Sequence, residues 1–269
     1  TVLVKSSCDS TVNSNELLFC LSQNAEQDHF DRNTAYQIYK KIIHKINETN
    51  DAIVKVSYIS MIKELIKKYV YVIDLIGINI VVDDFMSIIN NQSSQIVIAE
   101  VLNTLHLFDS LEIASEQRQK IIKCAKTLLQ NYVNHLVKNE CLLLLSDFAP
   151  IQQDVLQNGE LSVGQIQSEC IAIIKLLRDS SHYHDSRVRS TSLACIVSFI
   201  VNLNDFFRLN FIYFQLRLHK RGVKLDISLY SEFCEALADD YEGTRLTAVQ
   251  LLQVLSHNYG DWLVVILLY

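Results

Sequence analysis

His182, His184 and Asp185 stand within four residues, and closely spaced histidine and aspartate side chains often bind metal ions. A metal site on such a segment would need the pattern His-x-His-x-Asp-His on a loop after a β-strand. The segment His182-Tyr-His-Asp185 has no third histidine, and no strand is expected before it. The alternative is a polar turn between two helices in which Asp185 caps the second helix, and the sequence favours it.

Other residue types with chemical potential also lack the spacing of an active site. The seven cysteines are odd in number and widely separated, so they are expected to be buried thiols in a reducing compartment. The six glycines are isolated, which removes the P-loop and the dinucleotide-binding fingerprint. No nucleophile elbow accompanies any serine. The sequence therefore predicts a protein that is not an enzyme and has no cofactor and no metal site.

Basic residues recur near the start of the second helix of most expected repeats: Lys55, Lys138, Arg187, Arg189 and Arg245. They would form either a basic interaction ridge or a ladder of ion pairs with acidic groups in adjoining turns, such as Asp185 or Asp239. The net charge of −6 favours the ladder. The other basic cluster, His219-Lys-Arg221, is followed by Gly222 and is expected to end a helix.

These residues belong to a sequence pattern that occurs five times. Each copy has a polar turn, then a β-branched or basic pair, and then an amphipathic apolar run. The spacings between copies are 42, 41, 51 and 56 residues when each copy is anchored on Val54, Ile96, Val137, Val188 or Thr244. Such periods are typical of stacked helical hairpins, which share a continuous core and expose a long surface for partners. The expected fold class is all-α, an α-solenoid of about five HEAT-type helical hairpins.

Composition agrees with long helices joined by short turns. The chain of 269 residues has 49% hydrophobic residues, six glycines and one proline, so residues that break helices are scarce. The polar turns before the second helices, among them Asp51 and the turn 90–94, are expected to supply the helix caps. Apolar residues recur at helical spacing and put Ile62, Leu105, Ile196 and Leu237 in the expected core. Leu145 and Leu252 belong to the same expected core. Replacing either by alanine should cost about 2 to 5 kcal/mol, whereas Arg189→Ala should cost far less if solvent screens its ion pair.

The chain is expected to divide at four points. The parts are a lead-in segment with a helix (1–25), HEAT repeats one to four (26–196), an insertion (197–215), HEAT repeat five (216–261) and an apolar tail (262–269) that is either an artefact of the sequence or a truncation. Because the chain starts at Thr1 without methionine or signal pattern, it is expected to be a fragment.

Two interpretations of residues 197–215 remain open. One is a lengthened helix or an inserted arm, which solenoids accept at repeat edges. The other is a retained intron, because removing these 19 residues keeps the reading frame and restores a spacing of 37. Transcript reads that join Ile196 directly to Leu216 would support the intron, and reads that always cross the segment would contradict it.

The charge and hydropathy of the sequence limit the classes of partner that the chain can bind. Lysine and arginine are scattered through an acidic chain, so direct binding of nucleic acid is not expected. The longest apolar stretches are interrupted by charged residues or too short, so no transmembrane helix is expected. The partners predicted from the sequence are proteins.

The repeats resemble HEAT repeats, with an aspartate in the turn and Val-Lys or Val-Arg opening the second helix. The last third resembles the amino-terminal HEAT region of the Integrator complex subunit 4 family at 219–225, 229–230, 237–242, Arg245 and 248–251. Two earlier segments, 95–105 and 139–145, fit the same pattern in order. The resemblance covers most of residues 15–260. The chain departs from the family pattern at 197–215 and after Asp261.

This resemblance implies a nuclear, non-catalytic scaffold. Its partners would be the Integrator endonuclease pair of metallo-β-lactamase type, and its role would be support of small nuclear RNA 3′-end processing and nascent transcript cleavage. Two other functions stay open: a transport receptor or vesicle-coat adaptor, and a HEAT-like DNA glycosylase. A glycosylase would need a basic concave face with aromatic residues and a catalytic carboxylate. The only tryptophan is Trp262, in the apolar tail.

Overall fold

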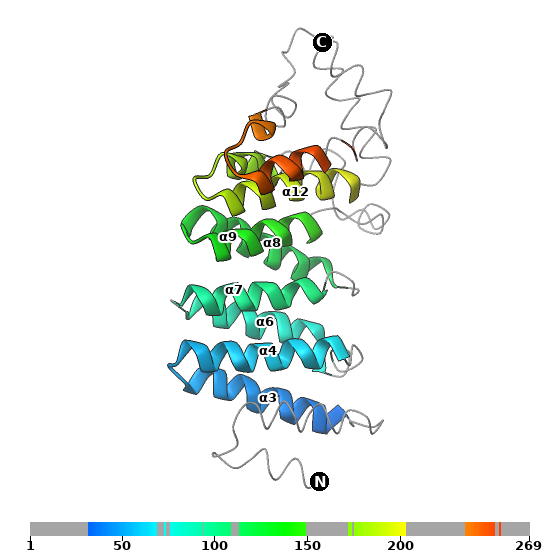
Figure 1. Ribbon diagram of the computed structural model, residues 1–269. Helices are drawn as coiled ribbons and strands as arrows, with labels where there is room; N and C mark the ends of the chain where they lie inside the picture. Colours follow the sequence, from blue (N-terminus) through cyan, green and yellow to red (C-terminus); the bar gives the residue numbers. More distant parts are fainter. Residues whose placement is uncertain are drawn as a thin grey trace. The chain divides into compact units, whose positions relative to one another are not determined.

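The fold was examined in a computed structural model, shown in Figure 1. The structure describes residues 32–68, 73, 76–92, 94–108, 113–148, 172–173, 175–202, 235–250 and 253. These residues form helices and turns, and their order confirms the expected all-α fold of α-solenoid type. The chain divides into two compact units, residues 1–121 and 122–269.

The first unit contains two stacked helical hairpins. Its helices are α3 (Arg32–Glu48), α4 (Ala52–Lys68), α6 (Ile78–Asn90), α7 (Gln95–Leu105), the short 3-10 helix η1 (His106–Phe108) and the start of α8 (Ser115–Asn131). Helix α3 packs against α4, and α6 packs against α7. The second helices of the two hairpins, α4 and α7, also pack against each other, which joins one hairpin to the next (Figure 1).

The second unit repeats this arrangement. It contains most of α8, then α9 (His135–Phe148), helical residues 175–181, α12 (Ser186–Asn202) and a helix at 242–250. Helices α9 and α12 make an extensive contact, as α4 and α7 do in the first unit. Stacking of second helices therefore occurs in both units.

The second helices of the repeats can be aligned residue by residue. We count each from its starting residue, whose carbonyl accepts the first hydrogen bond from the N–H four residues on: Asp51, Ser94, Asn134, Asp185 and Tyr241. Position +11 is then buried wherever the structure describes it, at Ile62, Leu105, Leu145 and Ile196. Because +3, +7 and +11 lie on one face of a helix, this spacing creates the continuous apolar stripe of each repeat.

Side chains cap most of these helices as the sequence predicted. Asp51 Oδ1 accepts hydrogen bonds from the N–H groups of Ile53 and Val54, and Asn134 Oδ1 accepts one from Leu136. Asp185 Oδ1 accepts one from the Arg187 N–H at 2.9 Å. These bonds satisfy donors in the first helical turn that have no partner inside the helix.

Three local expectations were wrong. Ser94 precedes α7 but its side chain makes no capping bond. Val97, not Ile96, matches Val54 and Val137, because Ser94 is the starting residue; Val97 is buried and Ile96 is 56% exposed. Leu237 was placed in the core and is 37% exposed, because its neighbour Ala236 faces inward there.

Several expectations fall outside the described residues. These are the lead-in segment 1–25, the cluster 219–222, the first helix of repeat five up to 234, Leu252 and the tail 262–269. Of the segment 197–215, residues 197–202 continue α12 and the remainder is outside the described ranges. Among the described helices, none combines the length and apolar character needed to cross a bilayer.

Candidate protein interaction surface

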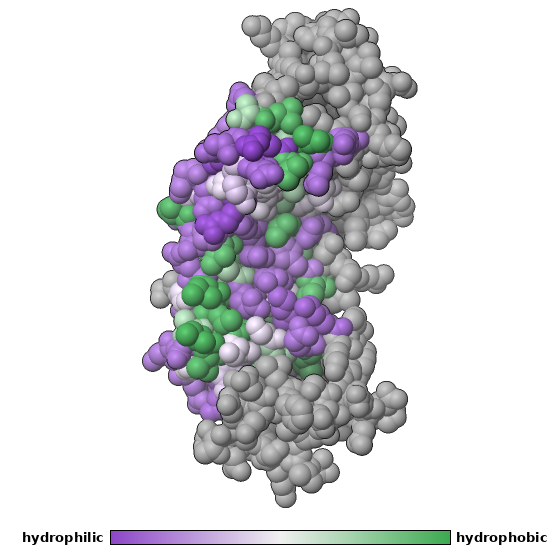
Figure 2. Space-filling view, in the orientation of Figure 1, coloured by the Kyte–Doolittle hydropathy of each residue, from purple (hydrophilic) through white to green (hydrophobic). Residues whose placement is uncertain are grey.

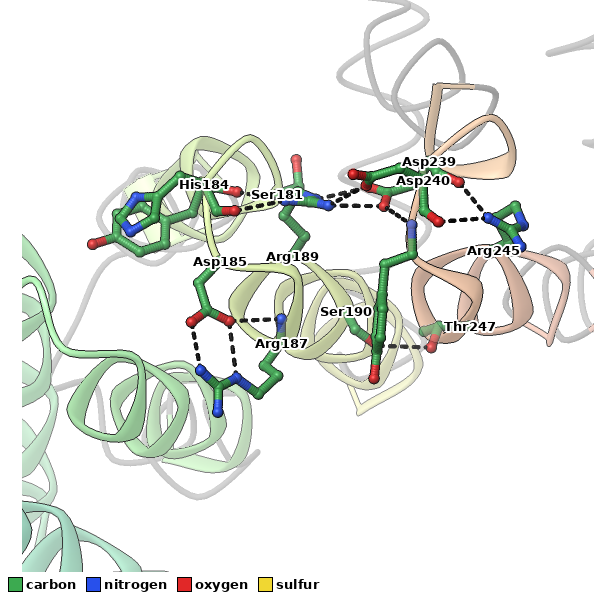
Figure 3. A network of polar contacts seen from close by, with 12 residues as sticks. Ser181, His184, Asp185, Arg187, Arg189, Ser190, Asp239, Asp240, Arg245 and Thr247 are labelled. Carbon is green, nitrogen blue, oxygen red and sulfur yellow. Dashed lines mark hydrogen bonds and ion pairs between the residues drawn. The ribbon is translucent and has the colours of Figure 1, made fainter.

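Arg189 lies at the joint between repeats four and five (Figure 3). Its Nε and Nη2 atoms donate to the two carboxylate oxygens of Asp239 at 2.7 and 2.8 Å, and Nη2 also reaches Asp240 at 2.9 Å. Its Nη1 atom donates to the carbonyls of Tyr183 and His184 in the turn before α12. One side chain thus fixes its own turn and binds the following repeat.

This joint is largely removed from solvent. The side chains of Arg189 and Asp239 are only 16% and 12% exposed, whereas Asp240 is 92% exposed. Asp239 also accepts a hydrogen bond from the Tyr241 N–H, so Asp239 and not Asp240 caps the helix at 242–250. A bidentate pair shielded in this way is stronger and more directional than a surface ion pair.

The joint between repeats three and four uses the same positions with different chemistry. Lys138 is at position +4 of α9, as Arg189 is in α12, and its Nζ atom lies 4.7 Å from the centre of the Tyr183 ring. Tyr183 is two residues before the starting residue of α12, the position that Asp239 holds in repeat five. The Tyr183 hydroxyl donates to the Val133 carbonyl at 2.7 Å. Position +4 of one repeat therefore contacts position −2 of the next.

Glu100 joins the two hairpins of the first unit through other positions than +4 and −2. It accepts a hydrogen bond from the Ser60 hydroxyl at 3.1 Å and lies 3.5 Å from Lys63 Nζ. Ser60 and Lys63 are on α4 and Glu100 is on α7, and the side chains of Lys63 and Glu100 are less than a fifth exposed. Sequence reasoning did not single out this joint, although Glu100 is an acidic residue between the apolar positions of α7.

The five basic residues of the predicted ridge have different environments. Arg189, Lys138 and Arg245 point into turns: Arg245 Nη1 donates to the carbonyls of Asp239 and Asp240 at 2.6 and 3.0 Å, and Lys138 Nζ donates to the Leu129 carbonyl at 2.7 Å. Arg187 is 56% exposed and forms a two-bond pair with Asp185 in its own turn. Lys55 is partly exposed, and no side-chain bond to another described residue is found for it.

Ion pairs with arginine shift the pKa values of two of the capping aspartates, Asp239 and Asp185. The hydrogen bonds from Arg189 hold the pKa of Asp239 at about 2, and those from Arg187 hold the pKa of Asp185 at about 2. A carboxylate whose folded pKa lies below its unfolded value stabilises the fold above the unfolded pKa. That contribution is lost as the pH falls toward the folded pKa.

We therefore expect the melting temperature to fall as the pH is lowered from about 5 to about 2. The fall should be steeper for the wild-type chain than for Asp239→Asn, because the variant has no carboxylate at position 239 to protonate. Thermal melts followed by circular dichroism at several pH values measure this. Equal slopes for the two proteins would show that the pair with Arg189 contributes nothing to the pH dependence.

Sequence reasoning missed a set of exposed apolar residues near the starts of the second helices. They are Ile53 (76% exposed), Ile96 (56%), Val133 (71%) and Leu136 (42%). Ile53, Ile96 and Leu136 all occupy position +2 of their helices. Figure 2 shows apolar patches of this kind between hydrophilic ones on the face it presents. The repeated sequence pattern held the signal, since an apolar residue precedes the valine at position +3 in these three copies.

The described cysteines are free thiols that are buried or half-buried. Burial raises the pKa of Cys124 to about 11 and that of Cys195 to about 12, so their thiols are protonated and poor nucleophiles at neutral pH. No group of three metal-binding side chains lies together in the part of the chain that the structure describes. Asp185 caps α12 and pairs with Arg187, as expected of a polar turn between two helices.

Comparisons with known proteins support a distant relationship to one protein. No protein-family profile matches the chain. It is similar to Integrator complex subunit 4 of mouse (29% identity over 185 residues), of human (29% over 187) and of Xenopus laevis (28% over 186). Each match covers 68% of this chain and 16% of the relative, so the matched part is a small fraction of the relatives' length.

A solved structure supports the fold alone. The crystal structure of an engineered protein superposes with a TM-score of 0.50 at 12% sequence identity, and the match covers 94% of both chains. The low identity means that this likeness supports the helical arrangement and carries no information about function.

Proposed function

We propose that this chain is a non-catalytic scaffold of HEAT-repeat type that acts in the nuclear Integrator complex. In this role it supports the endonuclease module during small nuclear RNA 3′-end processing and nascent transcript cleavage. Its partners are protein subunits, in the first place the endonuclease pair of metallo-β-lactamase type. The observation that carries the proposal is the similarity to Integrator complex subunit 4 over 68% of the chain.

The structure agrees with a binding role. Helical hairpins joined through their second helices give a long surface with many exposed turns, which is how repeat proteins recognise partners. The buried thiols and the capped, paired aspartates are used for stability. The pair of Arg189 and Asp239 holds two repeats together and Asp185 caps its own helix, so we assign binding to groups that remain exposed.

The exposed residues that we assign to binding are the apolar ones at position +2 together with two cations. In the first unit these are Ile53, Ile96 and Lys55, and in the second Leu136 and Arg187. We assign three residues of the predicted basic ridge to the turns and joints instead: Lys138, Arg189 and Arg245. Their cationic groups bind carbonyls or neighbouring repeats. Exposed apolar side chains beside charges are typical of protein interfaces.

A transport receptor or coat adaptor remains the second candidate, because helical arrays are frequent in both classes. Affinity purification of the tagged chain from nuclear extract, followed by mass spectrometry, separates the two. We expect Integrator subunits to be recovered, with the endonuclease pair among them. Recovery of transport or coat proteins without Integrator subunits would replace the proposal with the second candidate.

A further inference from the structure

Helix α9 exposes two leucines on one face. Leu136 and Leu143 are 42% and 38% exposed, and they lie seven residues apart, which is nearly two turns of a helix. Leu143 is at position +9 of its helix, where α4 has the polar residue Ser60 and α7 has Asn103. Stacking of second helices therefore does not require an apolar side chain at this position, and the leucine of α9 needs another explanation.

The neighbouring helix α12 has only a small side chain beside Leu143. Helices α9 and α12 pack against each other (Figure 1), and position +9 of α12 is the exposed residue Ala194. Both helices continue beyond these residues, α9 to Phe148 and α12 to Asn202. The exposure of this face is therefore not caused by an end of the described residues.

A cation lies at the other end of the same face. Arg187 is at position +2 of α12, as Leu136 is in α9, and the two helix starts approach each other where His135 Nδ1 lies 3.7 Å from Asp185 Oδ2. Arg187 binds Asp185 through Nε and Nη2, whereas its Nη1 atom donates no hydrogen bond to a described residue. In Figure 3 this guanidinium lies apart from the joint formed by Arg189. It is held in place by one carboxylate and has donors left for another.

We propose that Leu136, Leu143, Arg187 and Ala194, which we call the docking strip, bind one amphipathic helix of a partner protein. The helix lies along α9 and places apolar residues seven positions apart on Leu136 and Leu143. It also carries an aspartate or glutamate that accepts a hydrogen bond from Nη1 of Arg187. This docking is one form of the binding role proposed above, and it rests on that role but not on the identity of the partner.

The separation of the two leucines selects a helix. Seven residues of an α-helix span about 10.5 Å, so a helix lying along α9 presents apolar residues at the same interval. An extended chain presents the same face every second residue, at intervals of about 6.6 to 6.8 Å, so it cannot place apolar side chains on both leucines. The small side chain of Ala194 leaves room for the partner helix to approach α12.

The charge of Arg187 selects an acidic residue on that helix. A hydrogen bond between a guanidinium and a carboxylate is roughly twice as strong as one between neutral groups. A nucleic acid backbone would offer phosphates to Arg187 but no apolar surface to Leu136 and Leu143. The combination of one cation with two exposed leucines therefore fits a protein helix.

Site-specific photo-crosslinking tests this geometry in the full chain. The photoreactive amino acid p-benzoylphenylalanine replaces Leu136 in one protein and Leu143 in another, and each tagged protein is irradiated in nuclear extract. Mass spectrometry identifies the cross-linked residues. We expect both probes to reach one segment of one partner, at residues about seven positions apart. The control probe replaces Lys123, an exposed residue of α8, and should not reach that segment.

Substitutions then test the side chains of the docking strip. Recovery of the cross-linked partner should fall about tenfold or more for Leu143→Glu and about threefold or more for Arg187→Ala. The matched control Lys123→Glu should leave recovery unchanged. Leu143 and Arg187 are exposed, so thermal melts of their variants should stay close to that of the wild-type chain. Equal recovery by folded variants and wild type would overturn the proposal.

The cross-links separate the docking strip from the proposed function. Cross-links about three positions apart would show an extended partner segment, and this result, or the absence of cross-links from both probes, would overturn the proposal. Recovery of Integrator subunits without these cross-links would contradict the docking strip alone. Cross-links seven positions apart in a protein outside the Integrator complex would support the docking strip and contradict the Integrator assignment.

Discussion

Replacing Leu145 by alanine is expected to lower the free energy of unfolding by about 2 to 5 kcal/mol. Leu145 is fully buried at position +11 of α9, the helix that packs against α12. Removing most of its side chain leaves a cavity between rigid helices that relax only partly. Urea unfolding monitored by circular dichroism measures the loss.

Leu143 provides the matched control for this change. It lies two residues earlier on the same helix and is 38% exposed, so Leu143→Ala leaves no closed cavity. We expect a loss well below that of Leu145→Ala, of about 1 kcal/mol or less. Equal losses for the two variants would show that the face of α9 assigned to the core is wrong.

Replacing Arg189 by alanine is expected to cost roughly 2 to 4 kcal/mol, slightly below the range for a fully buried pair because some water reaches this one. The variant leaves the Asp239 carboxylate with 12% exposure and without its cation, and it leaves the Tyr183 and His184 carbonyls without a donor. The sequence had predicted a far smaller cost if solvent screened the pair. The structure shows that the pair is shielded, so the expectation changes.

The matched control is Arg187→Ala. Arg187 also forms a two-bond pair, but with Asp185 of its own turn and with a side chain that is 56% exposed, so its removal should have a much smaller effect. A double-mutant cycle of Arg189→Ala and Asp239→Asn then isolates the pair. A coupling energy near zero would mean that Arg189 does not hold repeats four and five together.

The repeated pattern made most of the fold predictable. Apolar residues at helical spacing placed Ile62, Leu105, Leu145 and Ile196 in the core, and all four are buried. A polar residue before each run located the capped turns, with Asp51, Asn134 and Asp185 as observed. These features are local, because they depend on residues within one or two helical turns.

The joints could not be predicted, because they depend on the stacking of different repeats. The sequence offered Asp185 and Asp239 as partners for the basic residues without a way to choose between them. The choice of Asp239 for Arg189 follows from their positions on adjacent repeats, separated by 50 residues. The exposed apolar residues at position +2 were hidden for a similar reason: Ile53 and Val54 are adjacent and alike, and only the helix register separates them.

The central claim is tested most directly by affinity purification of the tagged chain from nuclear extract, run beside the destabilised Leu145→Ala variant and a deletion of residues 197–215. We predict recovery of Integrator subunits by the wild-type chain and reduced recovery by Leu145→Ala. Stronger recovery after the deletion would support the retained-intron interpretation of that segment. A folded wild-type chain that recovers no Integrator subunit would contradict the account.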